Sequence, residues 1–159
     1  MKNINQYITE YIIKKKLDKP IDSEDHYKYF PETREKLIFY IKMLLDKGKT
    51  NFNCIDTSKI TDMSKLFSTK IIKFNDIDVS NWDVSNVTNM SCMFISSYYF
   101  NCDLSKWDVS KVENMSNMFK GCENFDCDFS KWNVSNVVDT TNMFYGCTSL
   151  KNKPSWYKE

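Results

Sequence analysis

The stretch FNCDLSKWDVSKVENMSNMFKGCEN, residues 100–124, is followed directly by a close copy of itself. Residues 125–149 read FDCDFSKWNVSNVVDTTNMFYGCTS, and residues 74–99 read FNDIDVSNWDVSNVTNMSCMFISSYY. A period of about 20–50 residues indicates one structural unit per repeat, each burying its apolar side against its neighbours. The sequence therefore predicts a solenoid.

The large apolar residues recur in the same register in each copy, which indicates core positions. We call the residues at one position of successive copies a column. The tryptophan column consists of Trp82, Trp107 and Trp132, and the phenylalanine column consists of Phe94, Phe119 and Phe144. The pattern Asp-Val-Ser-x-Val-x-x-Met is typical of a short strand because it is rich in β-branched residues. The pattern Met-Ser-x-Met-Phe-x-Gly-Cys is typical of a single helical turn that ends at glycine. Ser96 and Ser97 replace Gly-Cys in the first full copy, so we expect a distorted turn there.

Two amphipathic segments precede the repeats. Residues 4–17 place Ile and Tyr at helical spacing, and a second helix is expected from Pro31, which suits a first turn, to Gly48. We expect these helices to cap the first core layer of the array, and the alternative is a separate effector domain. The expected organisation is a helical cap over residues 1–50 and a repeat region over 51–159, with a partial repeat 52–73, full repeats 74–99, 100–124 and 125–149, and a C-terminal cap 150–159.

Charge and hydropathy give no sign of a nucleic-acid or membrane partner. The 159 residues carry a formal charge of +1, and the 11 basic and 8 acidic side chains of residues 1–50 do not form a polybasic arm. No run approaches the roughly 18 apolar residues of a membrane helix, and the first residues hold no signal-peptide core. We expect a cytoplasmic protein; the alternative is the cell surface, if translation starts upstream.

The six cysteines are expected to be reduced core thiols. Cys54, Cys102 and Cys127 are assigned to one repeat column, and Cys122 and Cys147 to another, as is typical of small buried side chains. Disulfides and a metal site are the alternatives. The chain has no CxxC pattern, and a single histidine does not complete a zinc site.

Aspartates flank each tryptophan and are the strongest metal candidates. The set consists of Asp78, Asp83, Asp103, Asp108 and Asp128, with Asn133 in the last copy. Stacked carboxylates could bind calcium between turns. We favour turn capping, because Asp and Ser side chains bond nearby backbone at bends. No metal ion or cofactor is expected.

No residues form a pattern typical of catalysis. A nucleophile or general base needs a matched partner, and Ser or Cys present in every copy indicates a structural column. Outward positions that differ between copies are the better candidates for a binding surface, because core columns must match their neighbours. The predicted binding residues are Asn86, Thr88, Tyr98, Tyr99, Lys111, Glu113, Asn136 and Val138.

The motif W-D-V-S-x-V-x-x-M-S-x-M-F-x-G-C, clearest at residues 107–122, resembles the BspA-type leucine-rich repeats. The resemblance is to their 26-residue surface-protein branch, found in mycoplasma lipoproteins, and it covers about residues 52–156. It implies an α/β fold, a right-handed leucine-rich-repeat-like solenoid with short parallel strands, here with the N-terminal two-helix cap. Family members are commonly secreted or lipid-anchored, and short members without a signal resemble products of phages and mobile elements.

These observations predict a non-catalytic module that presents a rigid solenoid face to a protein partner of unknown identity. The mixed charge of the variable columns argues against nucleic acid, which needs clustered cations. We expect a monomer. The alternatives are a fragment of a bacterial surface adhesin or antigen, and a phage inhibitor that sequesters a host protein or a small ligand.

Overall fold

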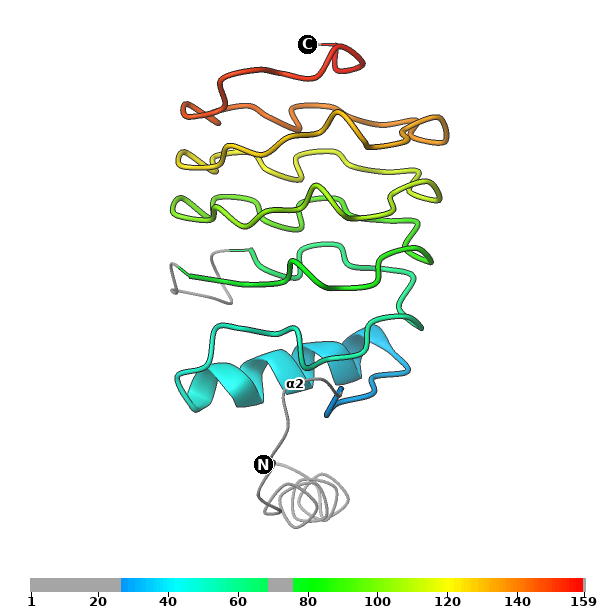
Figure 1. Ribbon diagram of the computed structural model, residues 1–159, viewed down its shortest axis with the longest axis vertical. Coiled ribbons are helices and arrows are strands. Elements are labelled where there is room, and N and C mark those ends of the chain that lie inside the picture. The colour runs from blue at the N-terminus through cyan, green and yellow to red at the C-terminus, as the bar shows by residue number, and fades with distance from the viewer. Residues whose placement is uncertain (1–26, 69–75, 159) are drawn as a thin grey trace, which may run out of the picture.

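The computed structural model describes residues 27–68 and 76–158 of the chain. In Figure 1 the chain winds through successive turns that are stacked along the long axis of the molecule. Helix α2 (Arg34–Asp46) lies across the N-terminal end of this stack. The C-terminal segment lies over the opposite end.

The start of helix α2 is set by a threonine cap. Thr33 has an extended backbone, and its Oγ1 accepts a hydrogen bond from the backbone N–H of Lys36 at 3.3 Å. The prediction that Pro31 occupies the first helical turn is therefore wrong, since the helix begins three residues later. Gly48 follows the helix with φ +70°, as expected for a left-handed cap. The helix buries Leu37, Ile41, Leu44 and Leu45.

The predicted fold class is wrong. Within residues 27–68 and 76–158 the structure has one α-helix and no β-sheet, so it is neither an α/β leucine-rich-repeat solenoid nor an array of parallel strands behind a two-helix cap. The other helix of the predicted cap, at residues 4–17, lies outside the described residues. Strand-like pairing in the described residues consists of isolated parallel bridges, which join Tyr29 to Ile55, Asn51 to Asp78, Asp62 to Asn89, Asn89 to Asn114, and Asn114 to Asp139.

Tight turns replace the predicted strands. In the middle copy the N–H of Trp107 bonds the Leu104 carbonyl at 3.1 Å, and the N–H of Val112 bonds the Val109 carbonyl at 3.0 Å. The first and last residues of each such turn are buried. Asp and Ser side chains favour turns by bonding the local backbone, so the β-branched valines enter the core without forming an extended strand.

The predicted helical turn is also absent. Asn117 and Gly121 have φ +54° and +75°, in the left-handed region and away from the geometry of an α-helix. Their N–H groups bond the Thr141 and Tyr145 carbonyls of the next turn, both at 2.8 Å, and not carbonyls four residues earlier. The segment therefore joins one turn of the stack to the next.

The expected distortion at Ser96 does not occur. Ser96 adopts φ +57°, and its N–H bonds the Lys120 carbonyl at 2.7 Å, just as Gly121 bonds Tyr145. The serine thus follows the backbone path of the glycines at the corresponding positions, although a left-handed conformation is costly for a residue with a Cβ atom.

Replacing Ser96 with glycine should therefore stabilise the protein by about 0.5–1 kcal/mol, because glycine adopts positive φ without steric cost. The matched change Gly121→Ala should destabilise it, since a Cβ at Gly121 would lie 3.5 Å from the Ser96 Cα and would carry the same backbone penalty. Urea unfolding of the three proteins measures both effects. Equal stability of Ser96→Gly and the parent chain would contradict the strain at this position.

Stacked aromatic rings fill the core. The rings of Phe67, Phe94, Phe119 and Phe144 follow one another at centroid distances of 5.3, 5.6 and 5.8 Å, with interplanar angles of 3–4°. Phe100 and Phe125 stack against this row from the side, at 4.0 Å from Phe94 and 4.2 Å from Phe119 respectively. Offset ring stacking adds to the burial of these large side chains.

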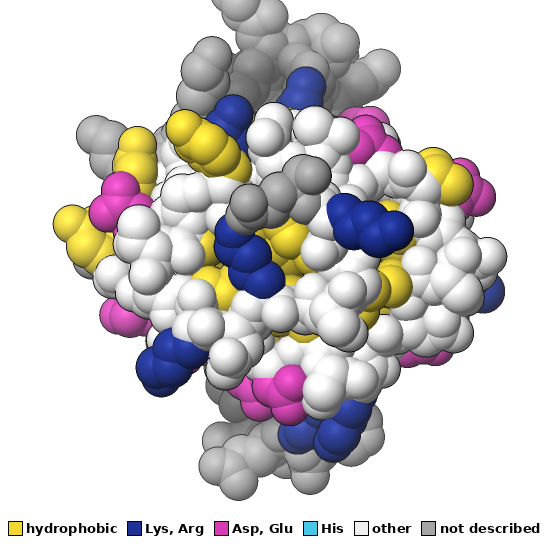
Figure 2. All heavy atoms as spheres, turned by 90° about the horizontal axis from the view of Figure 1, so that it is seen from above, with side chains coloured by type: hydrophobic (Ala, Val, Ile, Leu, Met, Phe, Trp, Pro, Cys, Tyr) yellow, Lys and Arg dark blue, Asp and Glu magenta, His cyan; other side chains and the backbone are white. Residues whose placement is uncertain are grey.

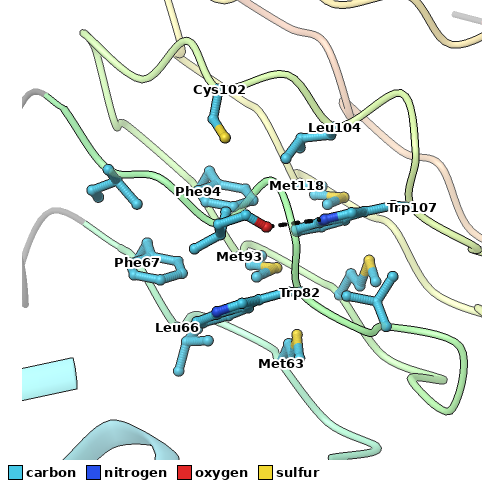
Figure 3. Close-up of a cluster of buried hydrophobic side chains, with 14 of the residues drawn as sticks. Met63, Leu66, Phe67, Trp82, Met93, Phe94, Cys102, Leu104, Trp107 and Met118 are labelled. Carbon is cyan, nitrogen blue, oxygen red and sulfur yellow. Dashed lines mark hydrogen bonds between the residues drawn. The ribbon is translucent and has the colours of Figure 1, made fainter. Parts of the chain in front are cut away.

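Each tryptophan of the repeats links two turns through its indole N–H. Trp82, Trp107 and Trp132 are 4–5% exposed, and they donate to the carbonyls of Phe52, Val79 and Leu104 at 2.9, 3.2 and 3.1 Å. Figure 3 shows the bond of Trp107 as a dashed line, beside Met93, Phe94 and Met118. The polar atom of each buried ring is therefore satisfied.

Candidate functional site

Three predicted binding residues form one row along the outside of the stack. The N–H groups of Thr88, Glu113 and Val138 donate to the carbonyls of Thr61, Thr88 and Glu113, each at 2.8 Å. We call Thr88, Glu113 and Val138 the side column. Glu113 is exposed and Val138 is 86% exposed, whereas Thr88 is half-buried. The backbone bonds fix the spacing of these side chains.

The neighbouring predicted residues bond along the stack. The side-chain amides of Asn86 and Asn136 donate to the carbonyls of Ser58 and Ser110 at 2.9 and 2.6 Å. The Lys111 Nζ donates to the Asn86 Oδ1 at 2.6 Å. These three side chains hold adjacent turns together and are less available to a partner than the sequence alone predicts.

Tyr98 and Tyr99 lie apart from these columns. Tyr98 is 48% exposed and Tyr99 is 60% exposed, and among the described residues no hydrogen bond or ring contact joins either side chain to the side column. Tyr99 lines a shallow hollow of about 370 Å³ together with Asp76, Asp78, Cys102 and Asp103. The eight predicted binding residues therefore do not form one continuous site.

The aspartates cap turns, as predicted. The Oδ1 atoms of Asp83, Asp103 and Asp108 accept the N–H groups of Ser85, Ser105 and Ser110 at 2.9–3.0 Å, and Asn133 does the same for Ser135 at 3.2 Å. Bonds from serine lower the pKa of Asp103 and Asp108. Across residues 27–68 and 76–158 no three Cys, His, Asp or Glu side chains are grouped to hold a metal ion.

All six cysteines are free, and their environments differ. Burial raises the pKa of Cys102 and of Cys147 to about 11, and it raises the pKa of Cys122 further. The assignment of Cys54 to the column of Cys102 and Cys127 is wrong. Phe52 lies at the repeat position of Val79, Leu104 and Phe129, because its carbonyl accepts the indole N–H of Trp82. Cys54 therefore lies two residues after this position, whereas Cys102 and Cys127 lie two residues before it.

We expect slow reaction of the buried thiols with a disulfide reagent at neutral pH. A thiol reacts as the thiolate, and a raised pKa keeps Cys102, Cys122 and Cys147 protonated until the pH rises well above 9. Thiol counting should give six free groups after denaturation without reductant, and fewer fast-reacting groups in the native protein. A count below six would indicate a disulfide. Rapid native labelling of Cys122 would contradict its burial.

The C-terminal end of the stack contains the predicted binding residue Val138, but the sequence did not predict a site formed by this end as a whole. Figure 2 views the molecule from this end and shows a hollow with hydrophobic side chains at its floor and lysines beside it. One hollow here, of about 600 Å³, is lined by Val138–Asn142, Tyr145, Tyr157 and Lys158. Tyr145 is 67% exposed, with the Lys120 Nζ 5.4 Å from its ring centroid. Residues 95, 120 and 145 differ between copies, and this variation had indicated an outward column at Tyr145.

The C-terminal segment covers this end only in part. The ring of Trp156 lies 6.3 Å from Phe144, and the ring of Tyr157 lies 5.0 Å from Phe144. The buried Nε1 of Trp156 has no hydrogen-bond partner in the described part of the chain, unlike the three repeat tryptophans. Trp156 therefore does not bond a neighbouring turn as the repeat tryptophans do, although Lys151 of this segment pairs with Asp126 of the last turn at 2.9 Å.

Comparison with known proteins places most of the chain in a family. Residues 39–157 match the model of the family described as "Mycoplasma protein of unknown function, DUF285". No curated protein and no solved structure matches the chain. In the described residues, no helix combines the length and hydropathy needed to cross a membrane.

Proposed function

This chain belongs to the family described as "Mycoplasma protein of unknown function, DUF285", and we propose that it is a non-catalytic module that binds another protein through the surface described above. The partner would contact the side column, Thr88, Glu113 and Val138, with Lys111 beside it. This face is mixed in charge, which suits complementary polar groups on a protein better than a phosphate backbone.

The observation that supports this proposal most directly is the rigid spacing of the side column. Backbone bonds of 2.8 Å hold the three residues in register, so little freedom would be lost when a partner binds. Val138 is 86% exposed, and an aliphatic side chain so exposed contributes little to the core. It can supply an apolar contact at the C-terminal end of this otherwise polar face.

The ionisable groups give the proposal further support, because their states do not suit catalysis. The cysteines with raised pKa values are poor nucleophiles at neutral pH. The aspartates with lowered pKa values are ionised and already accept turn N–H groups, so they are poor proton donors. Each of these groups has a structural role in its own repeat.

The proposal is tested by exchanging two charges on this face. A partner would first be captured from a lysate of the source organism with the immobilised chain and then purified. The double variant Lys111→Glu, Glu113→Lys should weaken its binding by about tenfold. The melting temperature should change little, because both side chains are exposed and the lost bond from Lys111 to Asn86 is an exposed side-chain bond of small net contribution.

The matched control exchanges two exposed charges on helix α2, Glu35→Lys with Lys42→Glu, and also leaves the net charge unchanged. It should bind with the affinity of the parent chain. Loss of binding in the α2 variant, with unaltered affinity in the side-column variant, would place the functional surface on the helix and refute the proposal.

A surface protein is the second candidate, supported by the resemblance of the Trp107–Cys122 motif to BspA-type surface repeats. The two candidates differ in location. Protease treatment of intact cells, followed by immunoblotting, should leave the protein intact if it is internal. Its degradation under conditions that spare a known internal protein would favour the surface candidate.

A further inference from the structure

Each turn of the stack donates a row of alternate N–H groups to the turn above it. In the middle copy, the N–H groups of Met115, Asn117, Phe119 and Gly121 bond carbonyls of the next turn at 2.8, 2.8, 3.0 and 2.8 Å. The turn below repeats the pattern with Met90, Cys92, Phe94 and Ser96 at 2.7–2.9 Å. The acceptor in each case is a main chain that follows the same path.

The last turn has the same row without acceptors. Its counterparts are the N–H groups of Thr140, Asn142, Phe144 and Gly146, which we call the terminal N–H row. None of the four has a hydrogen-bond partner in the described part of the chain. Asn142 and Gly146 have φ +53° and +78°, which match Asn117 and Gly121, so the donors keep the orientation of the row below.

The space beside this row can hold a ligand. The hollow of about 600 Å³ is lined by Thr140, Asn142, Tyr145 and Tyr157, among others, and Asn142 and Gly146 are exposed. Figure 2 shows the apolar floor at this end of the molecule. The aligned N–H groups and the apolar floor together suit a chain that offers carbonyl oxygens and apolar side chains.

We propose that the terminal N–H row binds a polypeptide segment that follows the path of a repeat turn and supplies successive main-chain carbonyl oxygens. The equivalent rows in the lower turns bind such a segment, which defines the chemistry of the occupant. Unpaired main-chain groups at an edge are a template for added chain. The four donors of this row are not members of the side column, although Val138 of the side column lines the same hollow.

A second copy of the protein does not fit this role. At the opposite end of the stack α2 covers the first turn, and the Arg34 guanidinium donates to the Ser64 carbonyl. The equivalent carbonyls of Ser91 and Ser116 accept N–H groups from the preceding turn. Two copies that met at their C-terminal ends would place donors against donors. The occupant is therefore another polypeptide with a repeat-like turn that no helix covers.

The test measures amide hydrogen exchange by NMR on the full chain, with a synthetic peptide of residues 110–124 as the probe. At about 1 mM peptide, exchange at Thr140, Asn142 and Gly146 should slow by about tenfold. The matched amides of Met115, Asn117 and Gly121 are already bonded and should not change. A peptide of scrambled sequence is the control and should give no protection.

The variant Thr140→Pro removes one donor of the row without breaking a hydrogen bond of the described residues, and it should weaken the protection at Asn142 and Gly146. If this variant unfolds, exchange in the parent chain still decides the question. Absence of protection at saturating peptide, or equal protection by acetate or phosphate, would overturn the proposal. So would protection that appears with rising protein concentration alone. Peptide-induced changes confined to Thr88, Lys111 and Glu113, which do not line the hollow, would likewise refute it and would leave the proposed function standing.

Discussion

Replacing Trp107 with alanine is expected to lower the free energy of unfolding by about 3–5 kcal/mol, because it leaves a large cavity in the middle of the stack. The side chain is 4% exposed, and its indole N–H bonds the Val79 carbonyl at 3.2 Å. Domains of this size are stable by about 5–15 kcal/mol in total, so the loss is a large fraction. Urea unfolding followed by circular dichroism measures it.

The matched variant Trp107→Phe separates packing from hydrogen bonding. Phenylalanine retains most of the ring contacts with Phe94 and removes only the donor to Val79. A buried carbonyl left without its partner costs about 1–3 kcal/mol, so this variant should be less destabilised than the alanine variant. A loss below about 1 kcal/mol for Trp107→Ala would contradict a core position.

Residues that share a column could be identified from the sequence, because the repeat spacing of 25 residues is uninterrupted from Trp82 to Trp132. The structure stacks the phenylalanines of that register ring on ring, with Phe94 and Phe119 at 5.6 Å. A column must match its neighbours in size and polarity, so its members recur in the sequence. The first, partial copy lacks the tryptophan, and there the register of Cys54 was assigned wrongly.

The path of the backbone within a turn could not be predicted from propensity. Val109 and Val112 favour a strand, but Asp108 bonds the N–H of Ser110 and closes a tight turn between them. Similarly, the segment around Asn117 has the composition of a helical turn, yet its N–H groups bond the next copy along the chain. Contacts between copies decide this geometry, and local sequence does not report them.

Only some features of the candidate binding residues could be predicted from the repeat pattern. Variation between copies correctly identified exposed positions such as Glu113 and Val138. It did not reveal that Asn86 and Asn136 bond carbonyls of the preceding turn. It also gave no indication of the terminal N–H row, because unpaired backbone groups leave no signature in side-chain identity.

Deletion of residues 1–48 is expected to leave a chain that aggregates or unfolds. Helix α2 buries Leu37, Ile41, Leu44 and Leu45 in the same hydrophobic cluster as Phe52 of the first turn. Burial of four such side chains contributes roughly 6–12 kcal/mol, an upper estimate that is comparable to the stability of the whole domain. Size-exclusion chromatography and thermal melting measure the outcome, with a chain that starts at residue 27 and keeps α2 as the control.

A pair of neighbouring substitutions tests the same role of α2 in the full-length protein. Ile41 is 1% exposed, so Ile41→Asp places a charge in the core and should abolish cooperative melting or lower the melting temperature sharply. Lys42 is exposed on the same helix, and Lys42→Asp should change stability by less than about 0.5 kcal/mol. α2 would be a separate module if the Ile41→Asp and Lys42→Asp variants had the same melting temperature and the chain without residues 1–48 were a monomer that unfolds cooperatively. A helix that closes the first turn of the stack requires the opposite result, because its apolar face then forms part of the repeat core.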